Sequence, residues 1–363
     1  MKALKLIGKI FALLILVVVL YALYIILTYH RIEDNVALDI HAPSASSGSS
    51  SLVQMDTSYR IVSYNIGFGA YSPDFTFFMD GGKSSVAESR DSVISLVSGA
   101  AQTANALDVD FAIFEEVDLD STRSHHVNQI DLITEFFSDY YYQYAINYDS
   151  AFLMVPPWEP HGKSLSSIAL YSRFPITSAV RRSFPIASDF NKFLDLDRCY
   201  SVSRIPVDDG NELCIYSVHM SAYGNDASVR EGQMKMLMKD MEAERASGNY
   251  IVCGGDFNHN MNPSAEEDDS TPSWAHPFPR EYLPDGFVNV MDLLSEEVQE
   301  SMPKSSRNTD IPYDPETSCQ VTLDGFVISD NISCKEFQVL DTGFSYSDHN
   351  PVIMTFALKP TAP

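Results

Sequence analysis

The 363-residue sequence predicts one mixed α/β domain preceded by a single apolar helix. From residue 58 onwards, short β-branched runs alternate with amphipathic stretches, a pattern typical of packed sheets and helices. Ahead of them, residues 10–29 form a run of 20 residues without a charge. The composition, with 45% hydrophobic and 20% charged residues, is that of a globular protein.

Seven apolar or alternating runs are typical of strands, at residues 60–66, 109–114, 167–171, 213–219, 250–254, 321–328 and 352–356. Two longer stretches, residues 84–107 and 227–246, have the pattern of helices. The methionines of the second helix form an apolar stripe that we expect to pack in the core. Over about 300 residues, this mixture predicts a single α/β domain with a large sheeted core.

The apolar run 10–29 is long enough to cross a bilayer core of about 30 Å. Lysines precede it at positions 2, 5 and 9, so the positive-inside rule predicts a cytoplasmic tail over residues 1–9 and an extracytoplasmic remainder. A cleaved signal peptide is the alternative, but its apolar region is about 7–15 residues and ends in small residues. This run is longer and ends in bulky side chains. We therefore expect a retained single-pass membrane anchor.

A flexible linker is expected over residues 30–57, followed by the catalytic domain over residues 58–363. The linker prediction rests on the segment HAPSASSGSSS at residues 41–51. Small polar residues of this kind do not bury enough apolar surface to order themselves.

The chain is strongly acidic, with a formal net charge of −25. Without the three N-terminal lysines, 21 basic residues face 49 acidic ones, a net −28. Such a surface repels polyanions at long range, which argues against a protein that coats duplex nucleic acid. A local basic pocket remains compatible with this charge.

The five cysteines form no C-x-x-C pair, so a zinc ribbon or a thioredoxin-like motif is not expected. Cys214 and Cys253 lie inside apolar runs and are predicted to be buried strand thiols. The sequence leaves open whether two of the other three cysteines, Cys199, Cys319 and Cys334, form a disulfide.

Polar residues recur where the predicted strands end, while the strand interiors stay apolar. The positions are Asn65, Glu115, Glu116, His219, Asp256, Asn258, Asp324, Asp348 and His349. Strand ends at one edge of a sheet converge in space, so these side chains are expected to share a pocket. Mg²⁺ prefers oxygen ligands of this kind and often binds substrate phosphate.

Each of these positions also has a purely structural interpretation when it is taken singly. Asn65 could bond nearby backbone, His219 could be a satisfied structural histidine, and the residues after Gly255 could form a tight turn. Their joint order along the chain is the informative signal.

That order resembles the endonuclease/exonuclease/phosphatase superfamily, which includes DNase I-like nucleases, neutral sphingomyelinases and inositol-polyphosphate 5-phosphatases. The matching segments are SYNI at 63–66, FEEV at 114–117, IALYSRFPI at 168–176, SVHM at 217–220, GDFN at 255–258, LDGF at 323–326 and SDHNP at 347–351. They span nearly the whole soluble part. The resemblance implies a four-layer α/β/β/α sandwich with the site at one end of two packed sheets.

The resemblance also implies roles for individual residues. It makes Glu116 the principal metal ligand, with Asn65 and Asp348 in the same metal site, for Mg²⁺ or Mn²⁺. Asp256 would orient or deprotonate the attacking water, and Asn258 would donate to the phosphate. The remaining implied catalytic residues are His219, which stabilises charge on phosphoryl oxygens, and the pair formed by His349 and Asp324.

One departure from the family concerns metal count. Some nucleases of the superfamily carry a carboxylate two residues after the position of Asn65, where this chain has Gly67. A second carboxylate ligand is therefore absent there, which weakens a two-metal interpretation.

Substrate contacts are expected from residues outside the shared motifs. The candidates for binding the phosphate or the leaving group are Asn225, Arg173, His126 and His161, with Arg123, His125 and Lys163 as further possibilities. The alternative for each is a surface or packing role.

The sequence is compatible with three functions. The favoured one is a membrane-tethered phosphodiesterase or phosphatase acting on a lipid head group or a small phosphorylated molecule. The second is an extracytoplasmic endo- or exonuclease, because acidic secreted nucleases occur in the superfamily. The third is a non-catalytic binding module of the same fold, against which the complete residue set argues.

Overall fold

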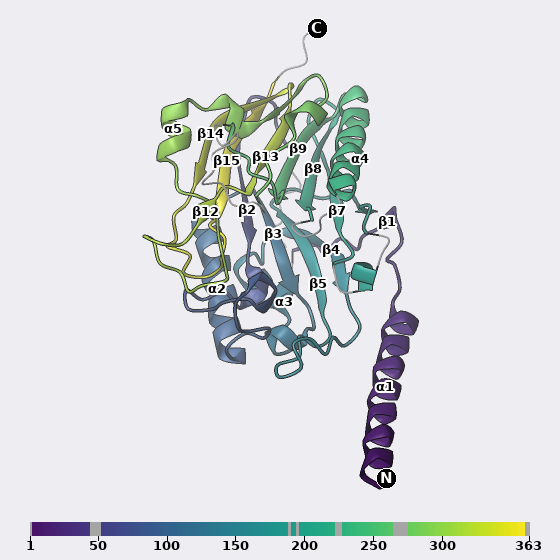
Figure 1. Cartoon of the computed structure of the whole chain (residues 1–363). Coiled ribbons are helices and arrows are strands. Elements are labelled where there is room, and N and C mark those ends of the chain that lie inside the picture. The colour runs from purple at the N-terminus through teal and green to yellow at the C-terminus, as the bar shows by residue number, and fades with distance from the viewer. Residues whose placement is uncertain are drawn as a thin grey trace.

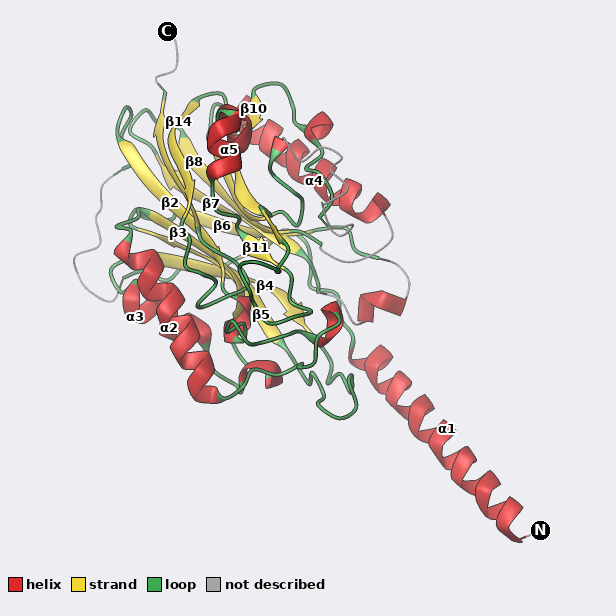
Figure 2. Ribbon diagram, turned by 60° about the vertical axis from the view of Figure 1, so that its left-hand side comes forward, coloured by secondary structure: helices red, strands yellow, loops and turns green. Residues whose placement is uncertain are grey.

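Two β-sheets pack face to face, and each carries helices on its outer face (Figures 1 and 2). The structure, a computed structural model, describes residues 2–43, 52–187, 190–193, 196–221, 227–263 and 275–359. The sequence of layers is helix, sheet, sheet, helix. This confirms the predicted four-layer α/β/β/α sandwich.

The first sheet has six strands in the order β14-β15-β2-β3-β5-β4. Their bounds are β14 (Ile332–Val339), β15 (Val352–Leu358), β2 (Ser58–Asn65), β3 (Phe111–Asp118), β5 (Leu165–Ser172) and β4 (Tyr141–Asp149). Within it, β2 and β3 are parallel and the other neighbours are antiparallel. Two helices, α2 (Arg90–Ala106) and α3 (Gln129–Phe136), cover its outer face (Figure 2).

The second sheet has seven strands in the order β1-β6-β7-β8-β9-β13-β10. Their bounds are β1 (Val36–Ala37), β6 (Ser178–Ser183), β7 (Cys199–Pro206), β8 (Glu212–His219), β9 (Tyr250–Asp256), β13 (Asp324–Ser329) and β10 (Phe287–Asn289). Strands β8 and β9 are parallel. The helix α4 (Ala227–Ala246) covers the outer face of this sheet. Between β10 and β13 the chain forms the short helix α5 (Glu296–Ser301) and a two-stranded ribbon of β11 (Ser306–Arg307) and β12 (Gln320–Val321).

Side chains along the central strands point alternately to the two faces of the sheet, and both faces are buried. In β2, Ile61 belongs to the core between the sheets, whereas Val62 and Tyr64 belong to the core beneath α2. Successive strand side chains point to opposite faces, so a continuous apolar run serves two cores at once. Cys214 and Cys253 are buried, as predicted, and all five cysteines are free thiols.

Two elements differ from the sequence prediction in their bounds. Helix α2 begins after Ser89, whose hydroxyl accepts a hydrogen bond from the Ser92 amide at 3.1 Å, so residues 84–89 are not helical. An N-cap serine satisfies an amide that the helix itself leaves unpaired. The run 321–328 divides into β12 and β13, which places Asp324 at the start of a strand.

The N-terminal helix α1 (Lys2–Thr28) projects from the domain (Figure 1). Its most apolar 18-residue stretch has a mean hydropathy of 3.2, and its apolar side chains from Leu4 to Leu20 are exposed. Its length and composition suffice to cross a membrane.

The segment that follows α1 differs from the flexible linker expected over residues 30–57. Arg31 forms an ion pair with Asp197, and β1 pairs with the edge strand β6. Residues 52–57 are also held, since Val53 is fully buried beside Val207. Backbone groups of a free sheet edge favour such pairing, which local composition does not reveal. Residues 44–51 lie outside the described part of the chain.

Candidate active site

Strand ends of both sheets meet at one end of the sandwich. Asn65 ends β2, His219 ends β8 and Asp256 ends β9, whereas Asp324 begins β13. The registers make them neighbours, because Asp256 lies opposite both His219 and Asp324. The convergence expected from the sequence is therefore produced by two parallel strand pairs and one antiparallel pair.

Glu115 and Glu116 face different surroundings. A β-bulge interrupts the pairing of β3 and β5 between Phe114 and Val117, and Glu116 has a φ of 54°. Bulges and left-handed non-glycine residues often serve to aim a side chain at a functional site. Glu116 lines the cavity, while Glu115 is fully buried and accepts a hydrogen bond from Ser63 at 2.6 Å.

A cavity of about 520 Å³ opens at this end, with aromatic and charged walls. Residues that line it include Phe68, Tyr71, Phe77, Met79, Asp80, Glu116, Arg123, Tyr148, His161, Arg198, His219, Asp256, Asn258, Arg307, Asp310, Asp348 and His349. A volume of this size is typical of a small-molecule site.

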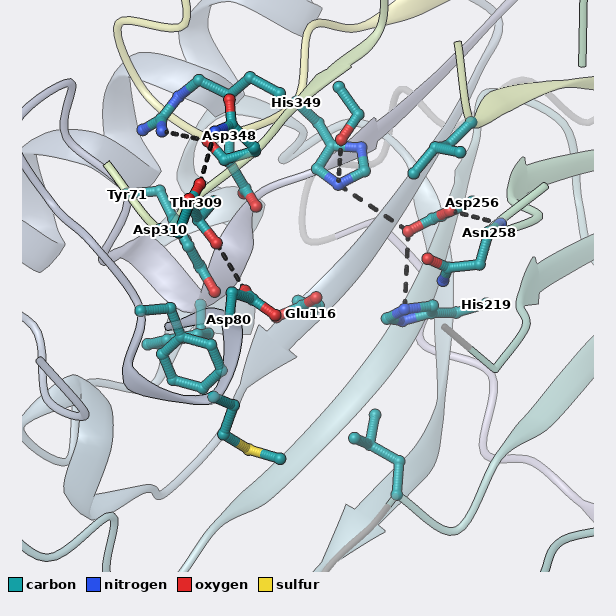
Figure 3. A pocket seen from close by; sticks show the side chains of 18 of the residues that line it. Tyr71, Asp80, Glu116, His219, Asp256, Asn258, Thr309, Asp310, Asp348 and His349 are labelled. Atoms are coloured by element: carbon teal, nitrogen blue, oxygen red, sulfur yellow. Dashed lines mark hydrogen bonds and ion pairs between the residues drawn. The ribbon is translucent and has the colours of Figure 1, made fainter. Parts of the chain in front are cut away.

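Asp256 lies at the centre of the polar groups (Figure 3). Its Oδ2 lies 3.1 Å from Asn65 Nδ2, 3.6 Å from His219 Nε2 and 3.9 Å from His349 Nε2. Its Oδ1 accepts a hydrogen bond from the backbone N–H of Asn258 at 2.8 Å. Burial and the neighbouring Asp324 raise the pKa of this carboxyl to about 7.

His349 and Asp324 form the expected pair. The Nδ1–H of His349 donates to Asp324 Oδ2 at 2.8 Å, and the Ser305 hydroxyl donates to the same oxygen at 2.6 Å. This fixes the orientation of the ring and directs Nε2 towards Asp256. Burial opposes protonation of the imidazole, but the carboxylates of Asp324, Asp348 and Asp256 outweigh it and raise the His349 pKa.

His219 has the opposite electrostatic environment. Burial, and then the nearby Arg198 guanidinium, lower the pKa of its imidazole well below the usual value. His219 is therefore neutral, and it can donate a hydrogen bond without carrying a charge into the cavity.

Glu116 and Asp348 supply carboxylates on the other side of the cavity (Figure 3). Burial, followed by repulsion from Asp348, raises the pKa of Glu116. Buried carboxylates crowded in this way, with oxygen atoms facing a cavity, fit a hard divalent cation.

Asn65 is oriented differently from the metal ligand that the resemblance implied. Its Oδ1 accepts a hydrogen bond from the Gly67 amide at 3.0 Å, and its Nδ2 faces Glu116 at 3.4 Å as well as Asp256. In this orientation the side-chain NH2 group of Asn65 donates to the carboxylates of Glu116 and Asp256.

A second acidic grouping has the spacing of metal ligands. Ligand atoms of Asp256, Asp324 and His349 all lie within 4.8 Å of one another. Since one Asp324 oxygen already accepts from both His349 and Ser305, this grouping is better explained as a positioned imidazole beside Asp256.

Three buried arginines line the cavity. Two of them are not among the candidates that the sequence pattern indicated. Arg123 binds Asp118 through two hydrogen bonds of 2.9 and 3.0 Å and lies 4.0 Å from the centre of the Phe68 ring. Arg198 and Arg307 are the additional two. Arg307 reaches the site because Ser306 pairs with His349, a contact between distant segments for which the sequence carries no local signal.

The predicted substrate-binding residues are distributed unevenly. His161 lines the cavity, and burial, with a smaller effect of Arg123, lowers its pKa to about 4. Arg173 and His126 do not line it: Arg173 pairs with Asp108, and the exposed His126 lies 2.5 Å from Asp120. Asn225 lies outside the described residues. Asn258 lines the cavity, but its side-chain amide donates to the Met220 carbonyl at 2.8 Å.

The model of the endonuclease/exonuclease/phosphatase family matches residues 62–349, so the chain belongs to this family. Its members are phosphoester hydrolases, usually dependent on a divalent metal ion. A search of curated proteins found no match.

Solved structures share the fold at low sequence identity. Truncated TDP2 from Caenorhabditis elegans is 14% identical, with a TM-score of 0.52 over 84% of this chain and 98% of that chain. The human Nocturnin catalytic domain, solved with a bound sulfate anion, is 16% identical, with a TM-score of 0.53 over 89% and 98%. ANGEL2, described as a 2′,3′-cyclic phosphatase, is 14% identical, with a TM-score of 0.53 over 90% and 99%.

Proposed function

We propose that the chain is a Mg²⁺- or Mn²⁺-dependent phosphoester hydrolase that acts on a lipid head group or a small phosphorylated molecule. Residues 10–29 would anchor it in a membrane, with residues 1–9 cytoplasmic and the catalytic domain, residues 58–363, extracytoplasmic. One observation carries the proposal: Asp256 lies between two imidazoles, while two further carboxylates face it across the same cavity.

The proposed chemistry divides among these side chains. A bound Mg²⁺ or Mn²⁺, held by Glu116 and Asp348, would neutralise phosphate oxygens and favour attack by water. Asp256 orients the attacking water and accepts its proton, consistent with a raised pKa.

The imidazoles and the guanidinium groups stabilise the developing charge. His349 is cationic beside Asp324, whereas neutral His219 donates a hydrogen bond to a phosphoryl oxygen. Arg198 and Arg307 place positive charge in the cavity wall, and Asn258 completes the lining.

The size of the cavity and the charge of the chain both favour a small substrate or head group. A cavity of about 520 Å³ suits a ligand of modest size. The net charge of −25 disfavours the broad phosphate contacts that hold duplex nucleic acid. Nuclease activity is therefore the competing outcome of the test.

The test measures hydrolysis of bis-p-nitrophenyl phosphate and p-nitrophenyl phosphate by the full chain in detergent micelles, with Mg²⁺, Mn²⁺ or EDTA. Plasmid DNA and RNA are assayed beside them. We expect turnover that requires the metal and is lost in the double variant Asp256→Ala/His349→Ala, but not in Asp285→Ala at an exposed carboxylate. Efficient degradation of DNA or RNA would favour the nuclease, and metal-independent turnover would contradict the proposal.

A further inference from the structure

The end of α1 contacts the loop that contributes His161 to the wall of the cavity. This β4–β5 loop comprises residues 150–164. The Tyr21 hydroxyl donates to the Phe152 carbonyl at 3.1 Å and accepts from the Met154 amide at 2.7 Å. The Phe152 amide donates to the Tyr24 hydroxyl at 3.2 Å. The helix is thus bonded to the backbone of this loop.

The residues after α1 hold the helix in a fixed relation to the domain. His30 Nε2 lies 3.2 Å from Asp149 Oδ2, and Arg31 pairs with Asp197. A few residues later, β1 joins the edge of the seven-stranded sheet. Because ordered contacts begin at the helix end itself, no free tether separates α1 from the sandwich.

The cavity lies at the same end of the molecule as these contacts. The β4–β5 loop begins after β4 and ends at β5, whose first residues pair with the end of β3 just beyond Glu116. Within or beside the loop, Tyr148 and His161 line the cavity. In Figure 1, α1 leaves the domain at this end, and the C-terminus lies at the opposite end.

Exposed apolar side chains concentrate on the same side. Outside α1, nine large apolar residues of the described chain are exposed: Leu52, Met79, Phe152, Met154, Val155, Trp158, Leu293, Val298 and Ile311. Four of them belong to the β4–β5 loop, and Trp158 is 79% exposed. Met79, which is 50% exposed, lines the cavity itself. Four exposed apolar side chains within residues 152–158 form a group of the kind that marks a binding surface.

The length of α1 places that group at membrane-interface depth. Because Tyr21 and Tyr24 are bonded to the domain, the part of α1 that crosses the bilayer core is residues 2–20 and not residues 10–29 as the sequence alone predicts. At 1.5 Å per residue, residues 2–20 span about 28 Å, close to the thickness of a bilayer core, and the lysines near the start extend towards the polar region. Tyr21 and Tyr24 then fall at the membrane interface, where tyrosine and tryptophan are enriched. The loop bonded to them lies at the same level.

We propose that the cavity faces the bilayer that α1 spans, with the β4–β5 loop seated in its head-group region, and that the substrate is the phosphoester head group of a membrane lipid. Both parts rest on the proposed function: the orientation rests on its membrane anchor, and the substrate assignment on its hydrolase activity. In the reaction, the water oxygen forms a bond to phosphorus, the phosphorus–oxygen bond to the leaving alcohol breaks, and a proton from water ends on the leaving oxygen.

The first experiment tests the orientation without reference to catalysis. The full chain with Trp274→Phe, which leaves Trp158 as its one tryptophan, is reconstituted in phosphatidylcholine vesicles that contain lipids with a nitroxide in the head-group region. A matched control carries Trp158→Phe, Trp274→Phe and Leu293→Trp, because Leu293 is exposed and lies outside the cavity wall. We expect the nitroxide to quench most of the Trp158 fluorescence and little of the control. Equal quenching in both, or none at Trp158, would overturn the orientation.

The second experiment tests the substrate. The variant Phe152→Ser/Trp158→Ser removes the two aromatic side chains that would seat the loop in the bilayer, so hydrolysis of vesicle phosphatidylcholine should fall tenfold or more. Hydrolysis of soluble bis-p-nitrophenyl phosphate should remain, which also confirms that the variant is folded. Equal loss on both substrates, or soluble turnover with no lipid turnover by the unsubstituted chain, would overturn the lipid assignment. Quenching at Trp158 with no turnover of any phosphoester would support the orientation and contradict the proposed function.

Discussion

The two sheets contribute different chemistry to the same cavity. The six-stranded sheet and the loop before β15 supply Glu116 and Asp348, whose carboxylates line the cavity and suit a cation, and Asn65, which donates to Glu116 and Asp256. The seven-stranded sheet supplies His219 and Asp256, which are suited to water activation and to phosphate. Neither sheet holds a complete site, so function depends on how the two are packed.

Two hydrogen bonds join these halves. One runs from Asn65 to Asp256 at 3.1 Å, and the other from His349 to Asp324 at 2.8 Å. Both connect one sheet to the other at the end of the sandwich where the cavity lies. The following substitutions break one half, the other half or the connection between them.

The largest effect is expected at Asp256, which contacts both halves. Asp256→Asn removes the proton acceptor but keeps the shape of the side chain, so kcat should fall by about 10³-fold or more. Steady-state kinetics on bis-p-nitrophenyl phosphate measure the change. Asp285→Asn, at an exposed carboxylate, is the control and should leave kcat unaltered. A fall of less than tenfold at Asp256 would remove it from the proposed role.

Glu116→Gln should impair the cation half selectively. It replaces a carboxylate with a neutral amide, so activity should fall by about 10²-fold at low Mg²⁺ and recover in part as Mg²⁺ is raised. Titration of activity against Mg²⁺ and calorimetric Mg²⁺ binding measure the two parts of this prediction. Glu115→Gln is not an equivalent control, because Glu115 is buried against Ser63. An unchanged Mg²⁺ dependence would assign the cation to other residues.

Asp324→Asn tests the connection between the halves, since Asp324 acts through His349. Loss of the carboxylate leaves the imidazole of His349 less well oriented and less basic. We therefore expect kcat to fall by about 10²-fold with little change in KM. Ser305→Ala, which removes one hydrogen bond to the same Asp324 oxygen, should have a smaller effect of about tenfold or less. If both variants lose activity equally, the pair has a structural rather than a positioning role.

Gly255→Ala should weaken the seven-stranded half through its backbone. Gly255 has a φ of 146°, and an added Cβ would meet the Val218 carbonyl in the β8–β9 pairing. Strain and overpacking together should lower the free energy of unfolding by about 4 kcal/mol. Gly210→Ala is the matched control, because its φ is also positive, at 91°, but its Cβ would meet open space. Chemical denaturation in detergent measures both, and an equal effect would contradict the steric argument.

The smallest effect is a pH dependence of stability from His161. Its folded-state pKa is lowered to about 4, so the unfolded chain binds the proton more tightly. The stabilisation from the neutral imidazole is therefore complete above about pH 6.5 and is lost as the pH falls towards 4, a change of about 3 kcal/mol. His161→Gln should flatten this part of the stability curve. His126→Gln, at an exposed histidine, should not, and an equal flattening in both would refute the assignment.

Local patterns in the sequence predicted much of this fold. The β-branched runs became β2, β3, β5, β8, β9 and β15, and the family order of motifs indicated the four-layer sandwich. Apolar runs and turn residues act on the backbone within a few residues, so their effect can be predicted from the sequence alone. The shorter or more polar strands β4, β6, β7, β10 and β14 were not predicted, because their stability comes from pairing with neighbours.

The sequence by itself determined which residues stand at the strand ends, since strand boundaries follow from local pattern. Only the tertiary structure decided how they are used. It turned Glu116 into the cavity through a bulge, brought Arg307 beside His349, and placed Arg173 and His126 away from the cavity wall. It also attached residues 30–43 to the sheet edge. Each of these outcomes depends on contacts between distant segments, whose free energy exists only once both partners are folded.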